Sequence, residues 1–201
     1  MFQHLQSRRP IHPVVRLLLA LAFTVGAFAV VSFAGTSTAS AHTSTTSGKN
    51  AQFEIRFMER LSDHHLAAVK ADSICLQKAT HDALRDMCAS DKASQQMEIS
   101  EMVSWLSQWY DVHYQPSLTP SSKAMVMYLS TLRKGKSFEV GYMENIMPHH
   151  LMAIKMARTC LAQASHQKLL NLCKDVISAQ TKEIQEMTGF LCRWYNICNK
   201  E

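Results

Sequence analysis

Apolar residues recur at three- and four-residue intervals through most of the chain after residue 50. Starting at Phe53, for example, they return at Phe57, Leu61 and Ala68, which places them on one stripe of a helix. No stretch of this region alternates apolar and polar residues as a half-buried strand would. The pattern therefore predicts an all-α protein.

The helical pattern occurs twice. A shift of 85 residues aligns 53–110 with 138–195 without a gap, and 23 of the 58 positions are identical. Chance would give about 6–8% identity for average residue usage. A repeat keeps apolar residues for packing, but this one also keeps polar residues within the apolar pattern, which suggests a site. The shared residues are His64-His65 with His149-His150, Gln95 with Gln180, Glu98 with Glu183, Met102 with Met187, Cys75 with Cys160, and Cys88 with Cys173.

Each repeat contains two helical stretches, and one hairpin alone cannot bury its own apolar stripe. We therefore predict a four-helix bundle made of two pseudo-symmetric helical hairpins, over 51–110 and 138–198, which form one domain. An exported chain of about 160 residues is long enough to bury the core of one such domain.

The connection between the repeats spans residues 111–137 and includes a predicted short crossover helix, Lys123–Lys134, which ends before Gly135. Within the hairpins, Thr80 and Ser165 occupy matching places between the two helices. Both residue types are favoured at the N-cap of a helix, so we expect them to cap the return helices.

The first 41 residues have the features of a secretory signal peptide. Leu17–Val31 is apolar but shorter than the roughly 20 residues of a membrane span, so a retained membrane anchor is the less favoured interpretation. Residues 42–50 are rich in Ser and Thr and are expected to form a flexible lead-in. The charged start and the cleavage site are Arg8, Arg9 and Arg16, and Ala39-Ser40-Ala41.

Removal of residues 1–41 changes the charge of the chain. It takes away three arginines and no acidic residue, so the formal net charge of +5 falls by three to about +2. No basic face is clustered as in nucleic-acid-binding proteins. We therefore expect no nucleic-acid partner and, after cleavage, no membrane association for a protein of the periplasm or extracellular space.

All six cysteines lie in the predicted exported part, where an oxidising compartment favours disulfides over thiolate metal ligands. The repeat selects one of the 15 possible pairings. Each half contains one pair of cysteines with the same spacing, and the remaining two cysteines near the C-terminus then pair with each other. The predicted disulfides are Cys75–Cys88, Cys160–Cys173 and Cys192–Cys198.

The first two predicted disulfides set the register of each hairpin. In an antiparallel pair of helices, residues at one height have a constant sum of residue numbers. The disulfides thus place His64-His65 level with Glu98, and His149-His150 level with Glu183. A carboxylate that faces an imidazole inside a helical bundle is a common way to build a metal site. Adjacent histidines lie about 100° apart on a helix, so they cannot both point in the same direction.

Methionines extend the candidate site in the second repeat. Met147, Met152 and Met156 share the helix of the histidines, and Met187 lies on the return helix. Imidazole and thioether ligands together favour copper, especially Cu(I), over hard cations, although another transition metal remains an alternative. The alternative is a purely structural role, in which the buried histidine and glutamate only hydrogen-bond to each other and the methionines fill the core.

These residues resemble a known family. The segment from Tyr142 to Ala157, which contains Met147-Pro148-His149-His150, and the later Gln180-x-x-Glu-Ile-x-Glu-Met187 are similar to the two motifs of the domain of unknown function 305 family. The resemblance covers 138–195 well and 53–110 as a divergent copy, so the chain resembles two tandem copies. It implies a ferritin-like helical bundle that binds copper outside the cytoplasm or confers copper resistance.

The first repeat departs from this pattern, because Ser62, Asp63, Ala67 and Ala71 replace Met147, Pro148, Met152 and Met156. We therefore predict one copper site in the second half, with ligands among the residues already named there. The site predicted in the first half binds metal more weakly, suits a harder metal ion, or is purely structural. Its residues are His64, His65, Glu98 and Met102.

The favoured function is an exported protein that binds or sequesters copper, with the metal ion as partner and a homo-oligomer as an open alternative. A second hypothesis is a metal-free helical interaction or stress-response module. A ferritin-like metal oxidase is less favoured, because such sites use helices with a Glu-x-x-His motif. This chain has Glu183-x-x-Glu186 but no histidine three residues after a core glutamate. Cleavage after Ala41 would also make His42 an N-terminal residue with a chelating amine and imidazole.

Overall fold

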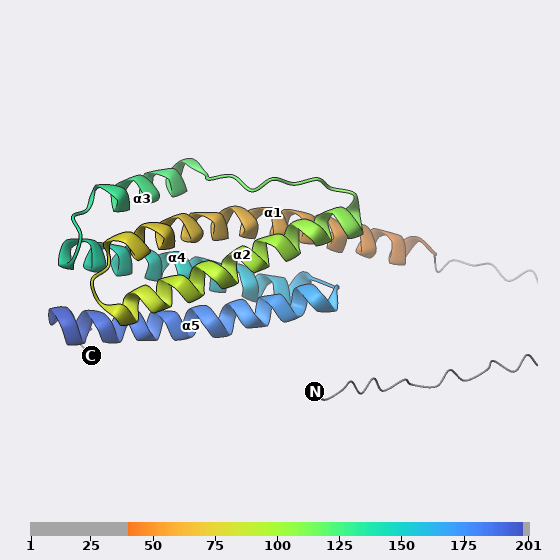
Figure 1. The fold of residues 1–201 in the computed structure, drawn as a ribbon. Coiled ribbons are helices and arrows are strands. Elements are labelled where there is room, and N and C mark those ends of the chain that lie inside the picture. The colour runs from red at the N-terminus through yellow and green to blue at the C-terminus, as the bar shows by residue number, and fades with distance from the viewer. Residues whose placement is uncertain (1–39, 199–201) are drawn as a thin grey trace, which may run out of the picture. The chain divides into compact units, whose positions relative to one another are not determined.

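A computed structural model describes residues 40–198. Five helices make up most of the described residues, and no described residue lies in a β-strand (Figure 1). The fold is thus all-α, as the periodicity predicts. The helices are α1 (Ser40–Lys78), α2 (Asp82–Tyr110), α3 (Pro120–Thr131), α4 (Lys136–Gln163) and α5 (Gln167–Tyr195).

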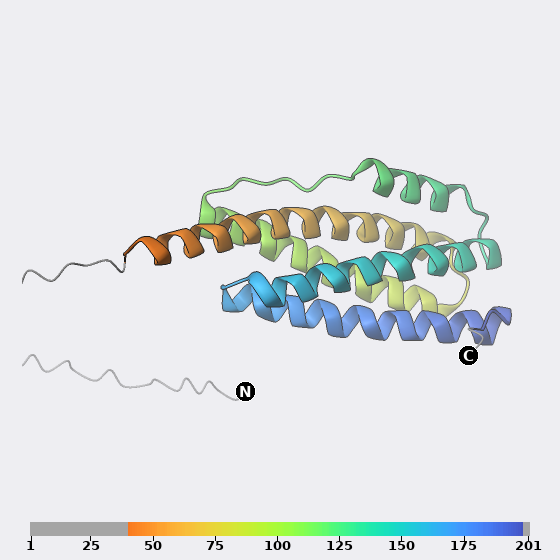
Figure 2. The same cartoon turned by 180° about the vertical axis from the view of Figure 1, so that it is seen from behind.

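The four long helices form two antiparallel hairpins, α1 with α2 and α4 with α5 (Figure 1). The hairpins meet mainly where α1 packs against α4. Helix α3 and the connection before it run along the outside of the bundle, and α3 contacts both α1 and α4 (Figure 2). The short helix therefore closes one side of the seam between the hairpins.

Three local features differ from the sequence-based expectations. Helix α1 begins at Ser40, so residues 42–50, expected to be a flexible lead-in, are helical. The crossover helix α3 is displaced towards the N-terminus from Lys123–Lys134, because Thr119 caps it and Pro120 supplies a favourable first residue. Gly135 instead precedes α4, with a φ of 88° that favours glycine. The predicted signal peptide lies almost entirely outside the described residues and stays a prediction.

The disulfides are Cys75–Cys88, Cys160–Cys173 and Cys192–Cys198, the same pairs that the repeat spacing predicts. The first two join the helices of each hairpin near its turn, where all four cysteines are fully buried. Apolar residues pack around them in two clusters. Met102 belongs to one cluster and Met187 to the other.

Each hairpin turn is capped by a glutamate of the other hairpin. Glu139 of α4 accepts hydrogen bonds from the backbone amides of Thr80 and His81 at the α1–α2 turn, and from the hydroxyl of Tyr195. The His81 ring nitrogen Nδ1 lies 2.6 Å from the same carboxylate. We call this arrangement a cross-hairpin cap.

The second cross-hairpin cap is its counterpart in the repeat. Glu54 of α1 accepts hydrogen bonds from the backbone amides of Ser165 and His166 at the α4–α5 turn, and from the Tyr110 hydroxyl. The N-cap residues of the return helices are therefore His81 and His166, without side-chain caps, rather than Thr80 and Ser165. The amides are satisfied from outside the hairpin, so a local capping hydroxyl is not required.

Candidate functional site: buried histidines at the hairpin seam

The two halves repeat one His–carboxylate pair. His65 Nε2 of α1 lies 2.8 Å from Glu98 Oε2 of α2, and His150 Nε2 of α4 lies 3.1 Å from Glu183 Oε2 of α5. These are the pairs that the disulfide register places at one height. Both imidazoles are buried, whereas both glutamates are partly exposed. The second histidine of each doublet is thus directed into its own hairpin.

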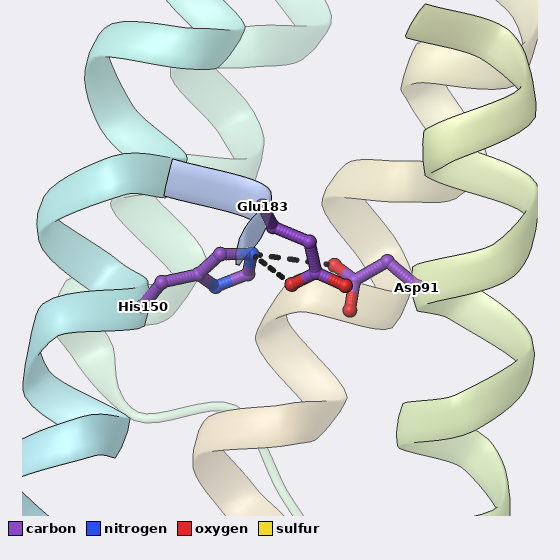
Figure 3. A group of neighbouring side chains, drawn as sticks. All are labelled: Asp91, His150 and Glu183. Atoms are coloured by element: carbon purple, nitrogen blue, oxygen red, sulfur yellow. Dashed lines mark ion pairs between the residues drawn. The ribbon is translucent and has the colours of Figure 1, made fainter. Parts of the chain in front are cut away.

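The pair in the second half has additional acidic neighbours. Asp91 Oδ2 of α2 lies 3.6 Å from His150 Nε2, and the other Asp91 oxygen accepts a hydrogen bond of 2.6 Å from Gln95 (Figure 3). Nearby Asp72 is also fully buried and accepts a hydrogen bond from the Tyr142 hydroxyl. The bundle therefore encloses carboxylates of α2 and α5 beside one imidazole, with Asp72 of α1 close to both carboxylates.

The environment of these acids raises their pKa values. Burial raises the pKa of Asp72 well above its ordinary value, and Asp91 and Glu183 raise it further, against the hydrogen bond from Tyr142. Burial likewise raises the pKa of Asp91, while His150 lowers it. A negative charge at either aspartate is therefore costly without a compensating cation.

The first histidines of the two doublets meet each other. His64 of α1 and His149 of α4 stack with ring centroids 3.6 Å apart and ring planes 24° from parallel. The four nitrogens of this pair are buried, and none has a hydrogen-bond partner. The residues expected to belong to separate sites in the two halves are therefore brought together across the hairpin seam.

Both stacked imidazoles are neutral at physiological pH. Burial lowers the pKa of His64 to about 3, and His65 and His150 lower it further. Burial lowers the pKa of His149 to about 2, with contributions from His64, His150 and His65. Neutral imidazole is the form that binds metals, so a metal ion would displace no proton from a ligand nitrogen. Unpartnered buried nitrogens otherwise cost stability, and a ligand would remove that cost.

A groove of about 610 Å³ opens beside the stacked pair. Met152 and Met156 line it together with His149, at the i, i+3 and i+7 spacing that places side chains on one helix face. Met152 is 56% exposed, which is unusual for a core-filling methionine. The wall formed by α3 adds Met125. The groove thus combines imidazole and thioether groups from three helices.

The other predicted ligands lie elsewhere. Met187 and Met102 are fully buried among apolar core residues, and the sulfur of partly buried Met147 accepts a hydrogen bond of 3.6 Å from Thr188. Asp63, which replaces the proline of the second repeat, accepts a hydrogen bond from the backbone amide of Ser117. This hydrogen bond fastens the connection that leads to α3 and so helps to place the third wall of the groove.

Four acidic residues (Glu54, Asp72, Asp91 and Glu139) and one methionine were not singled out from the sequence. Glu54 and Glu139 are matched in the repeat and lie on apolar stripes, so the alignment of the halves contained a signal for them. Asp91 aligns with Val176, and a buried acid at a position that is apolar in the other repeat is also a recognisable signal. No local signal marks Met125, because α3 has no counterpart in the repeat.

The comparison with known families follows from this geometry. The sequence model of the domain of unknown function DUF305 matches residues 54–191 in one span. The chain belongs to the DUF305 family. The match extends across both hairpins of this DUF305 protein, so it identifies one family domain, and the interpretation as two tandem copies stays a prediction. No curated protein has significant sequence similarity to the chain.

Solved structures with the same fold include CopM. The Cu(I)-bound form of CopM is 27% identical, with a TM-score of 0.63, and the match covers 71% of this chain and 97% of CopM. The Cu(II)-bound form is 26% identical, with a TM-score of 0.64 and the same coverage. CopM has also been solved with silver. These structures relate the present DUF305 protein to a copper- and silver-binding protein.

A more distant relative shows the fold alone. A DUF305 protein from Streptomyces coelicolor, described as a candidate secreted protein, is 23% identical with a TM-score of 0.61. The match covers 70% of this chain and 91% of that protein. Among residues 40–198, no helix of this DUF305 protein has both the length and the apolar character needed to cross a membrane.

Proposed function

We propose that this protein binds copper as Cu(I) in the groove at the hairpin seam, outside the cytoplasm. The observation that carries the proposal is the stacked pair of His64 and His149, which lies beside thioether groups that line the groove and whose four buried nitrogens have no hydrogen-bond partner. Neutral imidazole and thioether are soft or borderline ligands, and this combination favours Cu(I) over hard cations. The similarity to CopM, solved with Cu(I) and with silver, supports the same metal class.

The proposed ligands differ in their expected contributions. His149, Met152 and Met156 lie on one face of α4, so they can approach one ion without a change in the helix. His64 belongs to the same site, although the sequence suggested a separate and weaker site in the first half. Met125 is an additional candidate ligand from α3. The three disulfides are consistent with the oxidising compartment that export implies.

Competition with a chromophoric Cu(I) chelator under anaerobic conditions tests this proposal. We expect His149→Ala and His64→Ala each to weaken Cu(I) binding by tenfold or more, which corresponds to a loss of at least about 1.4 kcal/mol. Met156→Leu should also weaken binding, because leucine keeps the volume and removes the sulfur. Ag(I) should give the same ranking, since it is a soft monovalent ion that air does not oxidise.

Matched controls separate ligand loss from general damage. His113→Ala removes an imidazole that is 83% exposed in the connection, and Met127→Leu alters a methionine of α3 that does not line the groove. Both variants should bind Cu(I) as the unaltered protein does, and circular dichroism should show the same helix content throughout. Equal Cu(I) affinity in the controls and in His149→Ala would refute the proposed groove site.

A further inference from the structure

The carboxylate cluster around His150 breaks the symmetry of the repeat. The pairs His65–Glu98 and His150–Glu183 are equivalent, but their neighbours differ. Asp91 beside His150 aligns with Val176, Asp72 aligns with Ala157, and Tyr142 aligns with Phe57. Asp72 and Asp91 of the first repeat and Tyr142 of the second are therefore polar at positions where the other repeat has apolar side chains. Packing alone does not require them, because the apolar version of the same arrangement exists in the same molecule.

The nitrogen and oxygen atoms of this cluster that could bind a metal ion lie close together. Ligand atoms of Asp91, His150 and Glu183 all lie within 4.8 Å of one another. In Figure 3 the three side chains point towards a common centre from α2, α4 and α5. Asp91 is only 3% exposed, and its Oδ2 atom, directed at His150, has no hydrogen-bond partner. Glu183 Oε2 also lacks a hydrogen-bond partner, although it is within ion-pair distance of the imidazole.

The cluster holds more acidic groups than basic ones. Asp72, Asp91 and Glu183 supply three carboxyl groups, and His150 is the one imidazole within ion-pair distance of Asp91 and Glu183 in the described residues. Removing a carboxylate from water is unfavourable unless a partner compensates for it. A divalent ion held by Asp91 and Glu183 would neutralise both of these charges and would also give the unpartnered oxygens a ligand role.

We propose that Asp91, His150 and Glu183 form a second metal site, for a divalent ion of borderline hardness such as Zn(II). One imidazole nitrogen and two carboxylate oxygens suit such an ion and not the soft Cu(I) of the groove. The three protein ligands leave the fourth position of a tetrahedral ion for water. Glu183 is 16% exposed, so one edge of the site reaches the protein surface. This inference does not depend on the copper proposal, because it uses different residues.

Calorimetric titration with Zn(II), on the disulfide-bonded protein with its groove first saturated with Ag(I), tests the second site. We expect one equivalent of Zn(II) to bind to the unaltered protein. Asp91→Asn and Asp91→Val should each weaken that binding at least tenfold. Valine is the residue that the other repeat has at this position, so Asp91→Val should pack and fold even if asparagine is poorly accommodated.

Glu98→Gln is the matched control, because it changes the equivalent His–Glu pair, which has no aspartate within ion-pair distance among the described residues. It should leave Zn(II) affinity unchanged. Undiminished Zn(II) binding by both Asp91 variants, or no Zn(II) binding by the unaltered protein, would overturn the proposal. An equal loss in Glu98→Gln would also overturn it, since the ion would not depend on the additional carboxylate.

The Cu(I) competition assay keeps the two proposals distinguishable. Asp91→Asn should bind Cu(I) as the unaltered protein does, whereas His64→Ala should lose Cu(I) affinity and keep Zn(II) affinity. If both variants lost both metals to the same extent, the assignment of two separate sites would be wrong. If only Zn(II) binding failed in the unaltered protein, the copper groove would still stand.

Discussion

The cross-hairpin cap at Glu139 makes a prediction about stability and pH. Glu139 is fully buried and accepts hydrogen bonds from Thr80, His81 and Tyr195, which belong to the α1–α2 turn and to α5. Burial alone would raise the pKa of Glu139, but the hydrogen bonds from the Tyr195 hydroxyl and the backbone amides outweigh it and lower the pKa to about 2. The ionised carboxylate therefore stabilises the folded protein. Glu139→Gln keeps the shape of the side chain and removes the charge.

The size of the effect follows from the shift in pKa. A fall from 4.5 to about 2 corresponds to on the order of 3 kcal/mol by proton linkage. Thr80 is exposed and His81 partly so, and solvent weakens their hydrogen bonds. We therefore expect Glu139→Gln to lower the free energy of unfolding by about 2 kcal/mol at pH 7, in the range for charge-assisted hydrogen bonds. The midpoint of thermal unfolding should fall by roughly 4–8 °C for a domain of this size.

The pH dependence has a definite sign. The pKa is lower in the folded state, so the stabilisation is fully present above the unfolded pKa, near 4.5, and disappears as the pH falls towards 2. Urea unfolding of the disulfide-bonded protein, followed by circular dichroism at pH 7 and at pH 3, measures the difference between the unaltered protein and Glu139→Gln. That difference should shrink at pH 3.

Two variants serve as references for this experiment. Glu54→Gln removes the equivalent cap, where hydrogen bonds also outweigh burial and lower the pKa to about 2, so it should behave in the same way. Glu144→Gln changes an exposed glutamate on the same helix and should alter stability by less than about 0.5 kcal/mol. A loss in Glu139→Gln that stayed the same from pH 7 to pH 3 would refute the reasoning.

Two further predictions concern stability without metal. Asp72→Asn should raise the free energy of unfolding by about 1 kcal/mol at pH 7, since asparagine retains an acceptor for Tyr142 without the buried charge. Because the pKa of Asp72 is raised in the folded state, this gain should vanish as the pH falls below the unfolded pKa. Urea unfolding at pH 7 and pH 3 measures the change, and a gain that grew in acid would contradict the prediction. The double variant Cys160→Ala/Cys173→Ala should lose about 3 kcal/mol, given a separation of 13 residues, whereas Cys192→Ala/Cys198→Ala, with a separation of 6, should lose less. A larger loss at the C-terminal disulfide in the same assay would show that loop length does not govern these contributions.

The sequence by itself determined the helices, the hairpins and the height at which each His–Glu pair meets. Apolar periodicity reports local helical structure, and the matched cysteine spacing sets the register between neighbouring helices. Both signals lie within a single repeat. These signals place each His-His doublet level with its glutamate, and the structure shows that His65 and His150 make the contacts with Glu98 and Glu183.

The tertiary structure decided which side chains meet across the repeats. Periodicity fixes the buried face of a helix only to a broad arc, while contacts between hairpins depend on how each helix is rotated and where it crosses its neighbour. The stacking of His64 on His149, the approach of Asp91 to His150, and the cap of one turn by Glu139 of the other hairpin all depend on that packing. Met125 reaches the groove because the connection lays α3 against α1 and α4, a placement that no local pattern contains.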